Sequence, residues 1–386
     1  MSAITKLVSD TKQANKTFYR TERLEAQTGN DSMKFNYNGI SQFSSIRNTA
    51  SSSTLDRLGF KSEGTNLNLR YQNNTIIADS LFGIKYNLSN FDLNKYGFNH
   101  VTSEKTMGLY QNNNASQLAI LTDGIYKNID FTVNTLDNQT SLLNALSGLN
   151  LTYFKRAPSQ LFDQDAKSLN QRVAKNVSNS NKDFVTITYR VIAPPHSQLY
   201  VSIPNISWSD DNNHSLSITV NGVTRNQVTD NTFDFFDLGY FETESMVTIK
   251  LSFPGNKAIS FDNPSFYALD TQNYQIAMDT INERDTKVTT SKNKVFTDYS
   301  SHTNASLFFT IPYDKGWTAT INHKKVKIQR AQKGFMKVDV PSGKGEVVLT
   351  FIPYGLKTGL VISLLASIIF CCYAYFIRKI TVIQKR

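Results

Sequence analysis

Acidic and aromatic side chains alternate in one short stretch of the sequence, residues 230–237. The stretch contains three aspartates and three phenylalanines, at Asp230, Phe233, Asp234, Phe235, Phe236 and Asp237. Carboxylates accept hydrogen bonds from sugar hydroxyls, and aromatic faces can stack on sugar rings. Asp234, Phe236 and Asp237 are therefore candidates for a sugar-contact surface. The same alternation is typical of a strand with a buried aromatic face, and we favour that interpretation.

Other chemistry-bearing residues do not form a recognisable catalytic or metal-binding pattern. The five histidines show no metal-ligand spacing, at His100, His196, His214, His302 and His323. The tightest group combines His214 with Asp210 and Asp211, and its polar surroundings favour a solvated turn over a metal site. The sequence lacks the GxSxG, GxGxxG, HExxH and CxxC motifs. We therefore assign no catalytic residue, no metal ligand and no cofactor.

The elements that must position these residues change character along the chain. From residue 183 onward, short β-branched and aromatic runs alternate with turn residues, which predicts an antiparallel β-sandwich of jelly-roll type. Before it, strands alternate with short helices, which predicts a small α/β unit. The fold class is thus α+β, mainly β. The predicted segments are an α/β unit (1–125), a helix and linker (126–182), the β-sandwich (183–263), a helical connector (264–286) and a membrane-proximal β domain (287–354).

The C-terminal residues predict a transmembrane helix at 357–378. Residues 358–377 contain no charged side chain, and a helix of that length matches the hydrocarbon core of a bilayer. Four basic residues follow the span, Arg378, Lys379, Lys385 and Arg386, whereas Lys357 alone directly precedes it. This asymmetry predicts a cytoplasmic tail at 379–386 and an extracytoplasmic body. Both cysteines, Cys371 and Cys372, lie inside the span, so no disulfide supports the body.

The net charge bears on what the protein binds, and the first residues bear on how the body crosses the membrane. The formal net charge is +10, but the lysines are scattered and no basic run is typical of a nucleic-acid binder. Anionic lipid headgroups or anionic wall polymers fit this charge better. A surface that is basic merely for solubility explains the charge equally well. The first twenty residues have no apolar segment of the kind found in a signal peptide. We therefore expect upstream membrane segments or a polytopic partner to deliver the body across the membrane.

Several phrases, in order, resemble the YfhO family of bacterial multi-spanning membrane proteins. They are FYRTE (18–22), GISQFSS (39–45), LGF (58–60), ADSLFGIKYNLS (78–89), LYQNN (109–113), PYDKGW (312–317) and GFMKVDVPSGKGEVVLTFIPYGLKTGL (334–360). The resemblance covers almost the whole chain and reaches the membrane span. It implies kinship with the C superfamily of membrane glycosyltransferases. It also implies that the protein moves a sugar from a polyprenyl-phosphate carrier onto an extracytoplasmic acceptor, such as teichoic or lipoteichoic acid.

The resemblance implies a supporting role for this chain. In such enzymes the catalytic acid lies on an early outer loop, and this chain has no such loop. The body would then bind or orient the acceptor, and Arg20, Asp79, Lys85 and Tyr86 are candidates for contact with the donor phosphate or the acceptor. For each of them we favour a structural role. The alternative is a complete, membrane-anchored carbohydrate-binding or adhesion protein.

Overall fold

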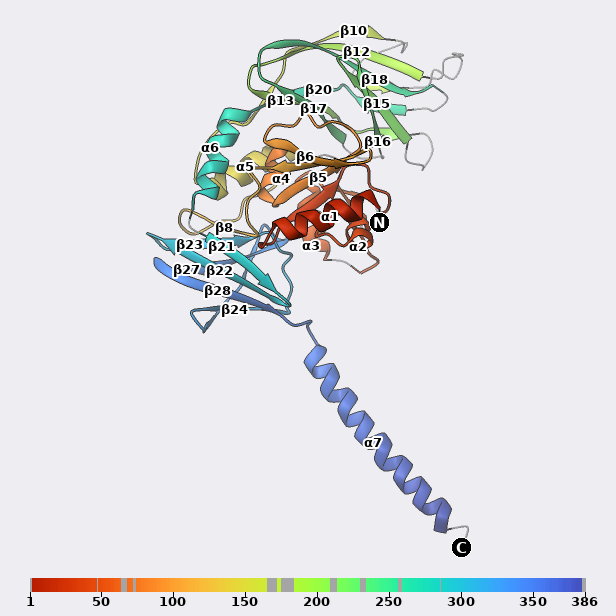
Figure 1. Cartoon of the computed structure of the whole chain (residues 1–386), viewed down its shortest axis with the longest axis vertical. Coiled ribbons are helices and arrows are strands. Elements are labelled where there is room, and N and C mark those ends of the chain that lie inside the picture. Colours follow the sequence, from red (N-terminus) through yellow and green to blue (C-terminus); the bar gives the residue numbers. More distant parts are fainter. Residues whose placement is uncertain are drawn as a thin grey trace.

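A computed structural model of the chain describes most of its 386 residues. The described residues are 2–46, 48–63, 68–71, 74–164, 172–174, 184–208, 214–229, 234–255, 259–284 and 286–383. They form a β-rich body in three parts, from which a single long helix extends (Figure 1). The predicted fold class is confirmed: the structure is mainly β, its sheets are chiefly antiparallel, and it has one C-terminal apolar helix.

The N-terminal unit has a four-stranded sheet of order β1-β5-β7-β6, in which β1 runs parallel to β5. Short helices surround the sheet. Helix α4 begins because the Thr75 side chain accepts a hydrogen bond from the Ala78 amide, and it buries Ile76 and Ile77. The elements are α1 (Ala3–Ala14), β1 (Arg20–Arg23), α2 (Asp31–Phe35), β2 (Gln42–Phe43), α3 (Thr49–Asp56), β3 (Lys61–Glu63), β4 (Asn68–Arg70), α4 (Ile76–Leu81), β5 (Ile84–Ser89), β6 (Phe98–Glu104) and β7 (Met107–Asn112).

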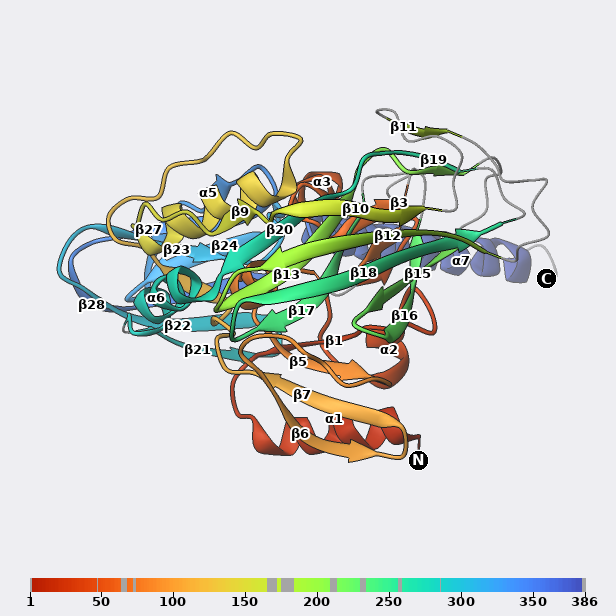
Figure 2. The same ribbon diagram turned by 90° about the horizontal axis from the view of Figure 1, so that it is seen from above.

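The β-sandwich packs a five-stranded antiparallel sheet on a four-stranded one. Figure 2 looks onto the larger sheet, whose order is β10-β12-β18-β15-β16; the smaller is β17-β13-β20-β9. One apolar core contains residues of both sheets, as period-two strands require. The strands are β9 (Phe154–Arg156), β10 (Ser159–Gln164), β12 (Phe184–Ala193), β13 (Ser197–Ile203), β15 (His214–Val220), β16 (Val223–Thr229), β17 (Asp234–Phe241), β18 (Ser245–Pro254) and β20 (Ser265–Asp270). A small third sheet holds β11 (Arg172–Ala174), β14 (Ser207–Trp208) and β19 (Ile259–Asp262).

The smaller sheet lies between two cores. On β17, Phe236 packs into the core of the sandwich, whereas its neighbour Phe235 packs into the core of the N-terminal unit. Successive side chains on a strand point to opposite faces, so one strand serves both cores. Helices α5 (Thr135–Ser147) and α6 (Thr271–Asn282) contribute Leu143 and Met278 to the same N-terminal core. The sandwich and the N-terminal unit therefore share a packed interface and are not independent domains joined by a linker.

The membrane-proximal β unit contains two further antiparallel sheets, of order β21-β22-β28-β24-β25 and β26-β27-β23-β8. Strand β8 comes from residues 119–121, inside the segment predicted as the α/β unit, and pairs with β23. Likewise β9 and β10, inside the predicted linker, join the sandwich. The strands are β8 (Ala119–Leu121), β21 (Thr286–Ser291), β22 (Lys294–Ser301), β23 (Ala305–Phe309), β24 (Trp317–Ile321), β25 (Lys324–Val326), β26 (Gln329–Ala331), β27 (Phe335–Val340) and β28 (Gly343–Phe351).

Helix α7 (Leu356–Ile383) leaves the body four residues after β28 ends (Figure 1). Its stretch Leu356–Arg378 is long and apolar enough to cross a membrane, and none of it is buried against the body. An apolar helix that has no protein partner in its own chain is unfavourable in water, where its side chains would remain hydrated. The structure thus agrees with the predicted membrane span.

Candidate functional site

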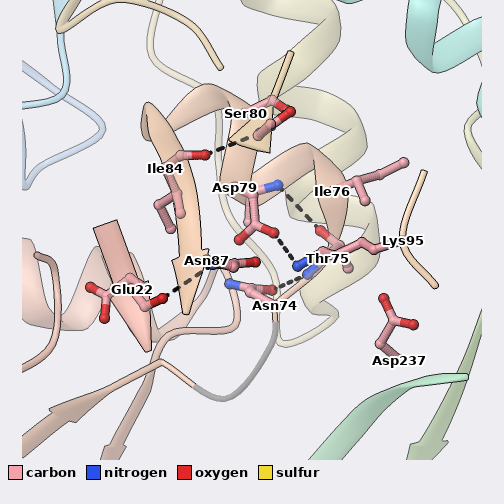
Figure 3. Close-up of polar contacts among 12 residues, drawn as sticks. Glu22, Asn74, Thr75, Ile76, Asp79, Ser80, Ile84, Asn87, Lys95 and Asp237 are labelled. Atoms are coloured by element: carbon pink, nitrogen blue, oxygen red, sulfur yellow. Dashed lines mark hydrogen bonds and ion pairs between the residues drawn. The ribbon is translucent and has the colours of Figure 1, made fainter. Parts of the chain in front are cut away.

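Three buried charged side chains meet where the N-terminal unit packs against the sandwich. Asp79 lies on α4, Lys95 lies on the loop before β6, and Asp237 lies on β17. The side chains of Asp79 and Lys95 form an ion pair, and neither is exposed to solvent. Asp237 is 8% exposed, and Figure 3 shows it on the other side of the Lys95 ammonium from Asp79. We call these three residues the charge cluster.

Neutral polar and aromatic groups complete the surroundings of the charge cluster. The Lys95 ammonium donates a hydrogen bond to the Tyr71 hydroxyl (3.2 Å) and lies 4.6 Å from the centre of the Phe98 ring. The Asp237 carboxylate accepts hydrogen bonds from the Gln198 amide, at 2.8 and 3.0 Å, and from the Gly239 amide, at 2.8 Å. Burial of a charge is costly unless it is compensated: Asp79 is compensated by its ion pair with Lys95, and Asp237 by the hydrogen bonds that it accepts.

Loss of hydration has the largest effect on the pKa values of the carboxyl groups in the charge cluster. Burial raises the pKa of Asp79 to about 6 and that of Asp237 to about 6, while the Lys95 ammonium opposes both shifts. Burial also raises the pKa of Glu22, on β1, to about 7, although Ile40 and Ser41 donate hydrogen bonds to its carboxylate. Two acids share one ammonium here, so the site carries excess negative charge when both are ionised.

Two surface hollows reach the edge of this cluster. One, of about 230 Å³, is lined by Asp237 together with Asn94 and Arg225. The other, of about 390 Å³, is lined by Tyr71 together with Glu25 and Arg70. Gln227 of β16 lines both, so the pair lies between the N-terminal unit and the β15–β16 hairpin. We call them the interface hollows.

The chemistry available in the interface hollows is hydrogen bonding and charge rather than covalent catalysis. Amide side chains, two guanidinium groups and two carboxylates line them, which suits a ligand with hydroxyl and phosphate groups. The Asp237 oxygens already accept hydrogen bonds from Gln198 and Gly239. Among the described residues no group of three or more histidine, cysteine or acidic side chains could hold a metal ion.

Arg20 connects two parts of the body. Its guanidinium donates hydrogen bonds to the carbonyl oxygen of Phe82 (2.6 Å) and to the carbonyl oxygen of Thr310 (2.8 Å). Thr310 directly follows β23, so Arg20 joins the N-terminal unit to the membrane-proximal β unit. Burial lowers the pKa of Arg20 to about 10. Its donors are aimed at protein carbonyls.

Lys85 and Tyr86 both contact the end of α1. The Lys85 ammonium donates a hydrogen bond to the Asn15 side-chain oxygen (2.6 Å), and the Asn15 amide donates to the Tyr86 hydroxyl (3.0 Å). Burial lowers the pKa of Lys85. Of the four candidates from the N-terminal unit, Asp79 alone belongs to the charge cluster, and a ligand role for any of them stays a prediction.

The described part of the aspartate and phenylalanine stretch, residues 234–237, lies on strand β17. Phe236 is 1% exposed and lies in the core of the sandwich, so the favoured interpretation, a buried aromatic face, describes it; an exposed contact surface does not. Asp237 reaches an interface hollow. The side chain of Asp234 lies outside the described residues, as do Asp210, Asp211, Asp230 and Phe233 and the side chain of His214.

The sequence interpretation missed Lys95, Gln198 and Arg225. Lys95 is the cation of the charge cluster, Gln198 donates hydrogen bonds to its Asp237, and Arg225 lines an interface hollow. No local motif marks them, because their partners lie far away in the sequence. The one usable signal was indirect: Asp79 stands next to the apolar pair Ile76-Ile77, and a carboxylate so placed needs a cationic partner.

Comparison with known protein families gives a match along nearly the whole body. The family model described as "Bacterial membrane protein YfhO" matches residues 1–363. The protein YfhO of Bacillus subtilis (strain 168) is 26% identical over 135 residues, a match that covers 33% of this chain and 16% of that protein. The matched part is thus a small fraction of the relative's length.

Among the solved structures that resemble this chain, two enzymes align with it at low scores. A cycloisomaltooligosaccharide glucanotransferase from Paenibacillus sp. aligns over 55% of this chain and 50% of its own, with 10% identity and a TM-score of 0.21. A GH26 endo-β-1,4-mannanase aligns over 30% of this chain and 26% of its own, with 17% identity and a TM-score of 0.20. Scores this low carry no functional argument.

Proposed function

This chain belongs to the YfhO family of bacterial membrane proteins, and from that premise we propose that it is the extracytoplasmic acceptor-handling region and last membrane helix of a glycosyltransferase-like protein. The larger protein would move a sugar from a polyprenyl-phosphate carrier onto a teichoic or lipoteichoic acid of the cell envelope. The body described here would bind or orient that acceptor. Upstream membrane segments, or a polytopic partner, would supply the catalytic loop.

The observation that carries the proposal is the extent of the family match. It runs through the β-rich body and into the membrane helix, to residue 363. Body and helix are therefore one inherited unit, and only four residues separate β28 from α7. A polymer held by this body would stay close to the bilayer, where a lipid-linked sugar donor must also be.

The interface hollows support the choice of acceptor. Teichoic acids combine polyol hydroxyls with phosphodiesters, and the hollows offer amide side chains beside Arg70 and Arg225. Arg225 is already held in place, because its guanidinium donates a hydrogen bond to the Asp92 carbonyl (2.7 Å) and lies 4.3 Å from the Phe91 ring. A guanidinium fixed in this way loses less entropy when it binds phosphate.

A binding experiment tests the proposal on the purified full chain in detergent micelles. Gln227→Trp places a bulky ring in both interface hollows, and Ser215→Trp places the same ring at an exposed position of β15, outside both. Immobilised lipoteichoic acid should retain the parent chain and the Ser215→Trp variant. The affinity of the Gln227→Trp variant for lipoteichoic acid should be lower by roughly tenfold or more, which is about 1.4 kcal/mol. Equal retention of all three, or retention no better than on a charge-matched polyanion, counts against the proposal.

A second measurement separates transfer from mere binding. The gene for the whole protein is replaced in its host by the Gln227→Trp allele, and the sugar content of purified envelope polymers is measured after acid hydrolysis. The proposal expects reduced sugar content with the polymer chains still present. Loss of polymer binding with unchanged sugar content would support the anchored carbohydrate-binding protein instead.

A further inference from the structure

A third hollow lies at the junction between the body and the membrane helix. It has a volume of about 210 Å³ and is lined by Lys315, Gly316, Tyr354 and Lys357, among others. Lys315 and Tyr354 are exposed, and the Lys315 ammonium lies 5.7 Å from the centre of the Tyr354 ring. Neither the predicted site residues nor the interface hollows include any of these side chains. We call this feature the junction hollow.

The walls of the junction hollow are fixed by the fold. The Ile352 amide donates a hydrogen bond to the Gly316 carbonyl oxygen (3.0 Å), and the rings of Trp317 and Phe351 lie 5.0 Å apart. A Cβ atom at Gly316 would collide with the Ile352 carbonyl oxygen, so only glycine permits this approach. The segment that leads into α7 is therefore tied to β24, and the walls of the hollow are held by contacts within the protein.

The junction hollow lies where the apolar stretch of α7 begins. Lys357 is the second residue of α7, and the apolar stretch of that helix begins beside it. The hollow must therefore lie at the level of the lipid headgroups, whichever side of the membrane the body occupies. Tyrosine is enriched at that level, because its ring is apolar and its hydroxyl is polar.

The charge around the junction hollow is strongly positive. Residues 286–357 contain twelve Lys and Arg against four Asp and Glu, so this part of the chain carries most of the net charge of +10. Asp314, the nearest acid in sequence, already accepts a hydrogen bond from the Gly316 amide (2.7 Å). Two lysines at headgroup level in such a field attract phosphate.

We propose that the junction hollow binds the phosphodiester headgroup of an anionic phospholipid, held between Lys315 and Lys357 beside the Tyr354 ring. The bound lipid would orient the body on the bilayer surface, because the hollow contacts β24 and α7 at once. This inference does not depend on the proposed sugar transfer. It concerns a different face of the molecule and a different ligand.

Native mass spectrometry of the full chain tests the inference. The chain is purified in neutral detergent and titrated with phosphatidylglycerol, with phosphatidylcholine as the zwitterionic reference. The double variant Lys315→Gln/Lys357→Gln removes the two lysines of the hollow. The double variant Lys324→Gln/Lys325→Gln removes equal charge from the exposed β25 hairpin of the same unit and serves as the matched control.

The expected result is specific retention of phosphatidylglycerol by the parent chain and the control. The hollow variant should bind it roughly 30-fold more weakly, since each lysine near the membrane surface contributes about fivefold. Equal losses in both variants, or equal retention of the two lipids by the parent chain, would overturn the inference. Glycerol phosphate is titrated in parallel, and binding as tight as that of the lipid would identify a soluble phosphate site instead.

Discussion

Among single residues, Lys95 is the one whose loss we expect to affect the stability of the body most. Its side chain has no exposed surface and is the cation of a cluster that also contains Asp79 and Asp237. A buried ion pair is weak support for stability when intact, but removal of one partner leaves an uncompensated charge in a medium of low polarity. The fold therefore depends on Lys95 more than on an average buried residue.

Replacement of Lys95 by methionine tests this dependence. Lys95→Met should lower the free energy of unfolding by about 3–5 kcal/mol, because Asp79 stays buried without its ammonium. Urea titration of the detergent-solubilised chain measures the change. Lys95→Met combined with Asp79→Asn should lose less than the single variant, and exposed Lys250→Met should stay within about 0.5 kcal/mol of the parent. A double variant weaker than the single one would contradict the argument.

The buried carboxyl groups also predict how stability depends on pH. The pKa values of Asp79 and Asp237 rise to about 6 and that of Glu22 to about 7, so the folded chain holds these protons at pH values where the unfolded chain has released them. Their contribution to stability is therefore greatest in acid and declines as pH rises from about 4 through 7. Exposed pairs such as Lys6–Glu104, where the pKa of Glu104 is lowered, act in the opposite direction.

Thermal denaturation at several pH values measures this dependence. Tm of the parent chain should increase as the pH is lowered from 7.5 to 5.5. Glu22→Gln keeps an oxygen to accept the Ile40 and Ser41 hydrogen bonds but cannot ionise, so its Tm should change less over the same range. Glu244→Gln, on an exposed turn, provides the control. A Glu22→Gln profile parallel to that of the parent would remove Glu22 from the explanation.

At the scale of elements, the structure differs from the sequence interpretation mainly in which strands pair. Strand β8 was placed with the N-terminal unit by proximity in sequence, but it forms an edge of the β26-β27-β23 sheet. Strand β17 carries Phe235 and Phe236 into two different cores. Pairing across such sequence separations binds the three parts of the body together, and Arg20 adds hydrogen bonds from β1 to Thr310.

The connection between β24 and the segment before α7 gives a prediction at this scale. Gly316→Ala should lower the free energy of unfolding by about 1–3 kcal/mol, the usual cost of overpacking, because the new methyl group meets the Ile352 carbonyl. It should also increase protease cleavage between β28 and α7. Gly359→Ala is the matched control, since its Cβ meets nothing within 4 Å. Unaltered cleavage of Gly316→Ala would show that the connection is not fixed as described.

At the scale of the whole molecule, the arrangement is a body with its most basic part next to a membrane helix. The N-terminal unit and the sandwich lie farther from α7 than the membrane-proximal β unit does (Figure 1). The interface hollows and the junction hollow lie in different parts of this arrangement. The proposed polymer site and the proposed lipid site therefore do not overlap, and the two proposals can be tested independently.

Membrane attachment and orientation are tested on cells that express the full chain. The chain should stay in the membrane fraction after alkaline carbonate washing, because the apolar stretch of α7 loses its favourable burial in water. If the body is extracytoplasmic, protease added to intact cells should digest it. Digestion only after permeabilisation would place the body in the cytoplasm and contradict the charge asymmetry around the span.

Features that depend on local spacing could be predicted from the order of the residues. The period of two along residues 184–254 predicted antiparallel strands, an uncharged run predicted α7, and ordered phrases indicated the family, because each signal is contained within neighbouring residues. Tertiary structure alone decided which residues meet. Asp79, Lys95 and Asp237 are separated by up to 158 positions, and no rule of local spacing can bring an N-terminal helix against a strand of the sandwich. Burial then set their pKa values, since the loss of hydration depends on what surrounds a side chain in space and not on what precedes it in the chain.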